Sequence, residues 1–269
     1  MAVITISRGS YSKGKEVAEK VAQRLGYECL SRDIILEASE EFHVPEIKLV
    51  RAIHDSPSIL DGFRFGKERY VAYIQAALLQ RFRKDNTVYH GLAGHFFVKG
   101  ISHVLKVRII ADMEDRIRLE MDREGITRAE AVHILKKDDE ERRKWSQALY
   151  GIDTWDPALY DLVIHIHKIT VDDAVDIICH TAGLEDFQTT RESQKAMRDL
   201  ALAAEVKAAL MQVHRDIEVT ADDGIIFAKV VAPISKGQTL SRDLEKAAKG
   251  IPGVKETKID VLPLTPFSE

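Results

Sequence analysis

Cysteine is scarce in this chain of 269 residues, which contains only Cys29 and Cys179, far apart in the sequence. Two distant thiols cannot build the disulfide framework of small secreted domains, and they lack the paired spacing of a cysteine zinc site. We therefore expect reduced, mostly buried thiols and no zinc centre, and the sequence assigns no side chain as a metal ligand.

Long apolar runs and an excess of one charge are also absent. No stretch approaches the roughly 18 apolar residues of a membrane helix, and the N-terminus lacks a basic region followed by a long apolar one. The net charge of −4 gives no electrostatic case for nucleic acid or an anionic membrane as a partner. We expect a cytoplasmic protein without a transmembrane segment. The length is compatible with one or two domains, and we expect two.

A strand, a glycine-containing loop and a helix open the chain. The β-branched run at residues 3–6 predicts a buried strand, residues 9–15 fit the phosphate-loop pattern G-x-x-x-x-G-K, and apolar residues from Val17 to Leu25 recur at helical spacing. An ordinary strand-to-helix turn is the alternative. The residues predicted to bind phosphate groups are Gly9, Ser10, Tyr11, Ser12, Lys13, Gly14, Lys15 and Glu16. Glu16 stands where the motif has the Ser or Thr that holds magnesium.

Further strands alternate with helical stretches, which predicts right-handed crossovers and a parallel sheet. A short strand at residues 27–30 leads to Asp33 at the carboxyl edge of the sheet, where ligands bind in open α/β folds. Asp33 is a candidate for contacting the second substrate or water around magnesium, and helix capping is the equally weighted alternative. The strand predicted for residues 87–91 ends in a turn that contains Gly91 and Gly94, and these glycines permit close approach of backbone or ligand.

Two charged segments are candidates for closing over a bound phosphate. Arg64 lies in a glycine- and aromatic-containing segment that we interpret as acceptor-binding. Residues 112–144 predict a helical hairpin in which Thr127 is the N-cap and Glu130 completes a capping box, and residues 145–157 are expected to form a loop. Arg116 and Arg142 would neutralise a transferring phosphoryl group if the hairpin is a lid. A solvated hairpin with i,i+4 ion pairs is the alternative.

A polar segment at residues 184–192 marks a linker between domains at residues 1–186 and 192–269. After it the pattern becomes helix, strand, strand, helix, strand, and Asp223-Gly224 is a hairpin signal. This αββαβ unit has no constellation of acid, base and nucleophile. We interpret it as a module for binding a partner or forming a homo-oligomer.

With these residues in view, the first 183 or so resemble the cytidylate kinase-like family of P-loop kinases. The last 75 or so resemble a BON domain, with Gly224 in the hairpin and Ile251-Pro252-Gly253-Val254 before the final strand. The kinase-like resemblance is carried by the segments at residues 4–8, 31–35, 91–94, 107–111, 115–117, 137–142, 160–164 and 168–175. It implies a P-loop kinase-like parallel sheet flanked by helices with a helical lid, followed by a small α+β domain.

The resemblance also implies phosphoryl transfer from ATP, with magnesium, to a nucleoside monophosphate of the CMP or dCMP type or a related small acceptor. Residues 9–15 would hold the donor, with Lys15 catalytic, Asp33 would face the acceptor, and Arg116, Asp138 and Arg142 would belong to the lid. Leu92 departs from the arginine usual in the glycine-rich turn. Glu16 and Leu92 leave open an alternative, a nucleotide-binding sensor with little or no catalysis that controls the C-terminal domain.

Overall fold

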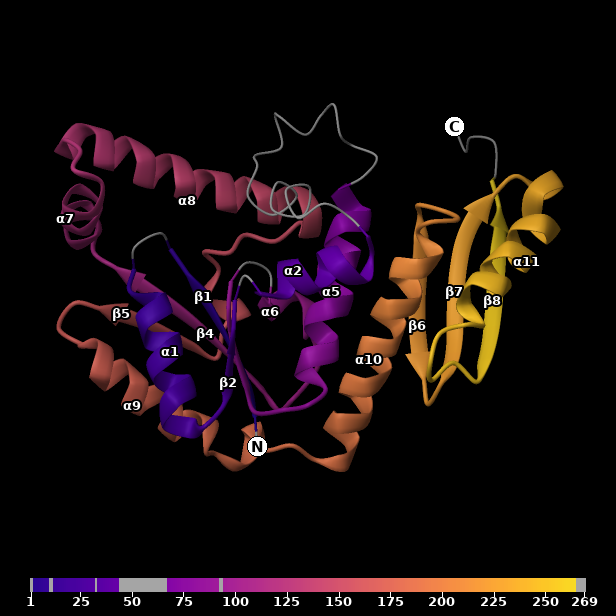
Figure 1. Cartoon of the computed structure of the whole chain (residues 1–269), viewed down its shortest axis with the longest axis horizontal. Coiled ribbons are helices and arrows are strands. Elements are labelled where there is room, and N and C mark those ends of the chain that lie inside the picture. Colours follow the sequence, from indigo (N-terminus) through magenta and orange to yellow (C-terminus); the bar gives the residue numbers. More distant parts are fainter. Residues whose placement is uncertain (1, 10–11, 32, 44–66, 92–93, 265–269) are drawn as a thin grey trace.

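The computed structural model describes residues 2–9, 12–31, 33–43, 67–91 and 94–264 (Figure 1). Five parallel strands form the central sheet in the order β2-β3-β1-β4-β5, which confirms the predicted parallel sheet. The strands are β1 (Val3–Arg8), β2 (Glu28–Leu30), β3 (Thr87–His90), β4 (Val104–Ala111) and β5 (Leu162–Ile166). β1 therefore lies at the centre of the sheet, and the loop that follows it opens at the middle of the carboxyl edge.

Helices cover both faces of this sheet, so the strands are apolar on both sides. Ile4 and Ile6 face the cluster made with α1 (Gly14–Leu25) and α9 (Val171–Ala182). Val3 faces the opposite cluster, which is made largely by α5 (Lys67–Phe82). The helices α2 (Asp33–Glu41) and α6 (Gly94–Phe97) lie on the α5 side. In chain order these helices lie between strands, as the alternation of strands and helical stretches in the sequence predicted.

The charged stretch forms the predicted hairpin from α7 (Met113–Glu124) and α8 (Arg128–Tyr150). The chain turns at Gly125, whose φ of 66° is in the left-handed region that favours glycine. The backbone N–H of Thr127 donates to the Glu130 carboxylate at 2.8 Å, and the Glu130 N–H donates to the Thr127 hydroxyl at 3.4 Å. The capping box is therefore confirmed.

The expectation of a loop over residues 145–157 is wrong in part, because α8 continues to Tyr150 and ends at Gly151, which has a φ of 64°. No glycine or proline interrupts residues 128–150, and the Ser146 hydroxyl donates to the Arg142 carbonyl at 3.1 Å within the helix. The longer helix crosses above the carboxyl ends of the strands (Figure 1).

The C-terminal unit has the predicted αββαβ order: α10 (Arg191–Leu210), β6 (Ile217–Asp222), β7 (Ile225–Ala232), α11 (Gly237–Ala248) and β8 (Glu256–Pro263). β6 and β7 are antiparallel, and β7 pairs in parallel with β8. Asp223 and Gly224 have φ values of 45° and 87°, as a two-residue hairpin turn requires. α10 begins at Arg191, inside the segment predicted to be a linker.

Helix α10 belongs to the cores of both units (Figure 1). Met197, Ala201, Ala204 and Ala208 pack in the cluster that contains α5, whereas Val206 and Leu210 pack with Ile217 and Leu244 of the C-terminal unit. The division at residues 186–192 stays a prediction. Within the described ranges, no helix is both long and apolar enough to cross a membrane.

Candidate functional site

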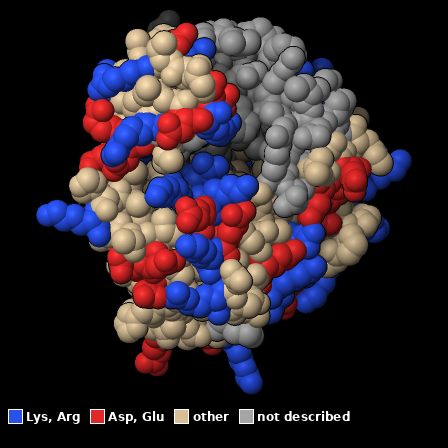
Figure 2. Space-filling model, turned by 60° about the vertical axis from the view of Figure 1, so that its left-hand side comes forward, with Lys and Arg blue, Asp and Glu red and all other residues tan. Residues whose placement is uncertain are grey.

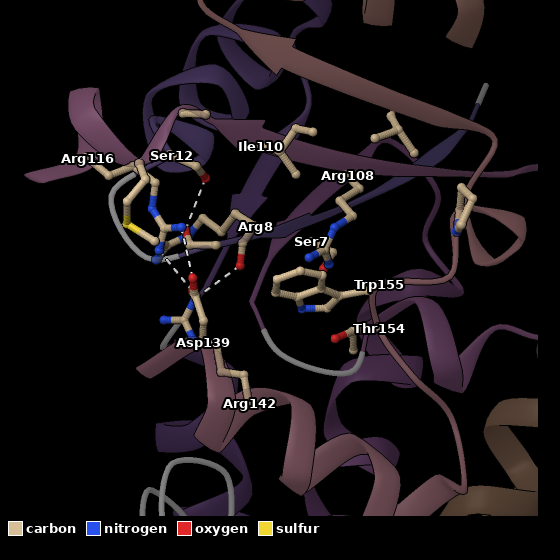
Figure 3. Close-up of a pocket in the computed structure, with 15 residues that line it drawn as sticks. Ser7, Arg8, Ser12, Arg108, Ile110, Arg116, Asp139, Arg142, Thr154 and Trp155 are labelled. Carbon is tan, nitrogen blue, oxygen red and sulfur yellow. Dashed lines mark hydrogen bonds and ion pairs between the residues drawn. The ribbon is translucent and has the colours of Figure 1, made fainter. Parts of the chain in front are cut away.

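The topology places a crevice at the carboxyl ends of β1 and β4. The connection after β1 leads to β2 at one edge of the sheet, and the connection after β4 leads to β5 at the other edge. Ligands of open α/β sheets bind where neighbouring connections diverge in this way. A cavity of about 330 Å³ lies at this point, lined by the ends of β1 and β4, by both lid helices and by residues 154–157 (Figure 3). We call it the sheet-side cavity.

One end of the sheet-side cavity is formed by lid arginines held above the loop. Arg116 makes a bidentate ion pair with Asp139, with Nη1 to Oδ2 at 2.8 Å and Nη2 to Oδ1 at 2.9 Å. Arg142 donates from Nη1 to the carbonyl of Arg8 at 3.1 Å (Figure 3). Arg116 is buried, so its charge is less screened by water than that of an exposed arginine. The hairpin therefore carries cations to the strand ends, as the lid interpretation requires.

The loop itself is tightly closed around Gly14. A Cβ at this position would lie 2.7 Å from the Cβ of Arg8, so only glycine fits. The buried Ser12 hydroxyl donates to the Gly9 carbonyl at 3.0 Å, and Lys13 adopts a left-handed φ of 61° without a side-chain cap on α1. The first N–H groups of a helix lack partners within the helix, and an uncapped N-terminus attracts anions.

Lys15 and Glu16 lie along α1, outside the sheet-side cavity. The Lys15 Nζ is 3.6 Å from Glu19, and its side chain is 64% exposed. Glu16 is 3.4 Å from the Nζ of Lys20, which also contacts Asp172 on α9 at 2.9 Å. The carboxylate of Glu16 is therefore paired with Lys20.

A second cavity, of about 540 Å³, lies on the outer side of the loop, and we call it the loop-side cavity. Its lining includes Lys13, Lys15, Glu16 and Asp138, and Arg142 lines both cavities. Figure 2 shows Lys and Arg side chains gathered near the centre of the face viewed there, with acidic side chains below them. Loop and lid together therefore make two adjoining cavities with cationic walls.

The other end of the sheet-side cavity is aromatic, a feature that no sequence motif predicted. Trp155 is 61% exposed, and the guanidinium carbon of Arg143 lies 5.8 Å from its ring centroid. Arg108 donates from Nη1 to the Tyr160 hydroxyl at 3.2 Å, and Tyr160 donates to the Thr154 carbonyl at 3.0 Å. The tryptophan within the otherwise mostly polar segment 151–157 is the sequence feature that could have indicated this aromatic end. Its flat face suits stacking of a nucleobase.

His95 lies behind this aromatic end, with Nε2 3.3 Å from the Tyr160 hydroxyl oxygen. Burial lowers the pKa of His95 to about 3, and the positive charges of Arg108 and Lys106 act in the same direction. His95 is therefore neutral at physiological pH and cannot serve there as an imidazolium acid.

We expect His95 to make folding stability fall in acid. Since its folded pKa lies below the ordinary value of 6.5, its contribution is fully present above pH 6.5 and is lost as the pH falls toward 3. Between these two pH values the free energy of unfolding should fall by about 1.4 kcal/mol for each unit that the pH is lowered, because the unfolded chain binds one more proton than the folded chain. Urea unfolding between pH 4.5 and 7.5 should show a smaller slope for His95→Gln. His180→Gln, at an exposed position, is the control, and equal slopes in all three proteins would contradict the expectation.

Gly91 and Gly94 make room for a neighbouring side chain of the chain itself. A Cβ at Gly91 would lie 2.4 Å from the hydroxyl oxygen of Tyr89, and one at Gly94 would lie 2.5 Å from the ring of the same residue. Neither glycine lines the two cavities described above. Ser10, Tyr11, Arg64, Leu92 and the side chain of Asp33 lie outside the described part of the chain, so their predicted roles stay predictions.

A model of the Cytidylate kinase-like family matches residues 3–168, which is more than half of the chain. The chain belongs to the cytidylate kinase-like family. The matched range includes the loop, the lid and all five strands of the central sheet, so both cavities are built from residues of the family domain. No protein with a curated description matches the chain significantly.

Solved structures resemble the kinase-like domain at low identity. An uncharacterized protein from Eubacterium ventriosum ATCC 27560 is 20% identical, with 68% of this chain and 98% of that one covered and a TM-score of 0.51. Shikimate kinase from Acinetobacter baumannii in complex with shikimate is 13% identical over 67% of this chain and 92% of that one, with a TM-score of 0.39. The first likeness shows a shared fold and nothing about the substrate.

Proposed function

We propose that this member of the cytidylate kinase-like family transfers the γ-phosphoryl group of ATP to a nucleoside monophosphate of the CMP or dCMP type, or to a related small acceptor. The observation that carries the proposal is the Arg116–Asp139 pair beside Gly9, with Arg142 bound to the backbone of Arg8. Phosphoryl transfer is catalysed mainly by positioning and by neutralising charge on the transferring group. Cations held above a loop at the strand ends meet that requirement.

Asp139 fixes the plane of the Arg116 guanidinium by accepting two hydrogen bonds. An arginine held in one plane is well suited to phosphate oxygens, because its five N–H donors have a rigid, planar arrangement. The uncapped N-terminus of α1 contributes further N–H donors toward the same loop. We propose that these groups hold the donor phosphates before the acceptor arrives.

Lys15 can exchange its present partner for a phosphate at little cost. Its contact with Glu19 is an exposed pair at 3.6 Å, and such pairs contribute only about 0–1 kcal/mol. The side chain is long and flexible, and it lines the loop-side cavity. Binding a phosphate there would need only a rotation of the Lys15 side chain, with no movement of the backbone.

The cavities fit the phosphates of ATP better than they fit a bare magnesium ion. No hydroxyl follows Lys15, and Glu16 faces Lys20. Magnesium keeps several water ligands and usually binds through substrate phosphates with one or two carboxylates. Asp138, in the lining of the loop-side cavity, is a carboxylate that would hold part of its water shell. When bound, the ion would supply charge neutralisation on the β- and γ-phosphates.

Trp155 supplies the face on which we propose that a nucleobase stacks. The two cavities, of about 330 and 540 Å³, fall within the range of about 300–1,000 Å³ that is typical of small-molecule sites. Arg108, on the floor of the sheet-side cavity, adds a fixed cation beside that face. Nothing in these contacts selects cytosine over another base.

A coupled assay with ATP, magnesium and a panel of nucleoside monophosphates tests the proposal. We expect turnover with at least one acceptor, and a loss of at least about 100-fold in kcat/KM for Lys15→Ala, since it removes a charge from the phosphate site. Lys249→Ala, which removes an exposed lysine just after α11, should keep the full rate. The absence of turnover with every acceptor would refute catalysis.

A nucleotide-binding sensor is the second candidate function, and the position of Glu16 favours it. The residue that replaces the magnesium-binding hydroxyl is paired with Lys20, and α10 connects the kinase-like domain to the C-terminal unit. This candidate predicts ATP binding by calorimetry without turnover, and a change of partner or oligomeric state on binding. We propose the BON-like character of residues 192–269 and its role in assembly on the sequence resemblance and the αββαβ order.

A further inference from the structure

A cluster of two aspartates and two histidines lies where the lid joins the sheet. Asp112 directly follows β4, and Asp115 lies in the first turn of α7. His165 lies in β5, and His167 follows the strand. β4 and β5 pair with Ile110 opposite His165, so the strand register brings together residues about 50 positions apart. The cluster belongs to neither cavity described above.

Three donor atoms of the cluster converge on one point. The Oδ2 atoms of Asp112 and Asp115 each lie 3.2 Å from Nδ1 of His167, and all three atoms are within 4.8 Å of one another. In a tetrahedral zinc site with bonds of about 2.0–2.1 Å, neighbouring ligand atoms are about 3.3 Å apart. The spacing from His167 to each carboxylate is therefore close to that of two edges of such a site.

The other oxygen of each carboxylate is bound by a residue outside this group of three. Oδ1 of Asp112 is 3.0 Å from Nε2 of His165, and Oδ1 of Asp115 pairs with Arg118. These outer contacts turn both Oδ2 atoms toward His167. Carboxylates and histidines that bind metals are oriented by outer partners of this kind.

Hydrogen bonding alone does not satisfy this arrangement. A neutral imidazole carries at most one proton on Nδ1, which would have to serve two carboxylate oxygens at the same distance. Two carboxylate oxygens therefore converge on a single ring nitrogen. Imidazole is a ligand of zinc, nickel, copper and iron, whereas magnesium prefers oxygen ligands and water.

We propose that Asp112, Asp115 and His167 bind one divalent transition-metal ion of the zinc type, with His165 as a positioning residue for Asp112. The exposed side of the cluster leaves room for water to complete the coordination. Such an ion would connect β5 to the first turn of α7, next to Arg116. The sequence analysis assigned no metal ligand, because it did not bring the two ends of this cluster together. The site does not depend on the proposed phosphoryl transfer.

Titration calorimetry of the full chain with Zn²⁺, after chelation and with a phosphine reductant in place of a thiol, tests the proposal. We expect one site per chain in the wild type and at least a 100-fold loss of affinity in His167→Gln. In His165→Gln the loss should be about 10–100-fold, as for other outer-shell partners. His180→Gln removes an exposed histidine of α9 and should bind as the wild type does.

A thermal melt supplies a second measurement that does not need enzyme activity. Zn²⁺ at a hundredfold excess over Kd should raise the Tm of the wild type by about 5 °C, and that of His167→Gln by much less. Because the side chains are exposed, the substitutions should leave the unliganded Tm within about 2 °C. Zn²⁺ binding of equal strength in His167→Gln, or a response to Mg²⁺ alone, would overturn the proposal.

Discussion

Replacing Arg116 by alanine is expected to lower kcat for phosphoryl transfer by about 1,000-fold, within the range seen when a cation that stabilises a transferring phosphoryl group is removed. Arg116 is the buried cation of the sheet-side cavity, and Asp139 fixes its guanidinium. The positive charge of Arg116 would stabilise the transition state more than bound ATP, because negative charge develops on the transferring group. KM for ATP should therefore change less than kcat.

The Arg116 variant needs two controls, because it also leaves Asp139 without its bidentate partner. Arg128→Ala removes an exposed lid arginine whose carboxylate partner is Glu114, and it should retain most of the activity. Asp139→Asn keeps a similar shape but loosens Arg116, and a smaller loss of kcat is expected. Circular dichroism and a melt should show that each variant is folded. An Arg116→Ala protein that is folded and fully active would contradict the proposed role.

The largest loss of stability is expected from Ala201→Asp in helix α10, at about 3–5 kcal/mol. Ala201 is fully buried in the cluster shared with α5, where a carboxylate would have no water around it. The total stability of a domain is only about 5–15 kcal/mol. Denaturant unfolding should show the loss, and the Tm should fall by about 10 °C.

Arg198→Asp is the matched control, since it introduces the same side chain three residues earlier, on an exposed surface of α10. Its effect should stay within about 0.5 kcal/mol. If α10 belonged only to the C-terminal unit, Ala201→Asp would leave the kinase-like domain intact, and the two parts would melt separately. That outcome would contradict a shared core.

Local sequence patterns predicted most of the helices and strands, because each of these elements is marked by residues within its own segment. The β-branched run at residues 3–6 marked β1, and the capping box at Thr127 located the start of α8. The end of α8 was misjudged because charged and aromatic residues around Lys144 resemble a loop in composition, although nothing there breaks a helix. The glycine that ends the helix, Gly151, was the better signal.

The site was predicted less completely, because its contacts depend on how elements pack. The hairpin and its arginines follow from sequence, but the rotation of α8 decides that Asp139, rather than its neighbour Asp138, pairs with Arg116. Arg108 and Trp155 reach the cavity from separate elements, and no spacing in the sequence links them. The direction of Lys15 along α1 depends on a flexible side chain, which a motif does not specify.

The shared helix α10 also has a consequence for synthesis on the ribosome. The face of α5 that packs against Ala201 and Ala208 stays uncovered until those residues are made. From Arg83 to Ala208 the ribosome adds 126 residues, which takes about 6–25 s at about 5–20 residues per second. During that interval the nascent kinase-like domain presents an apolar strip that a chaperone can bind. The synthesis of α10 therefore determines when the apolar face of α5 is covered and the risk of aggregation falls.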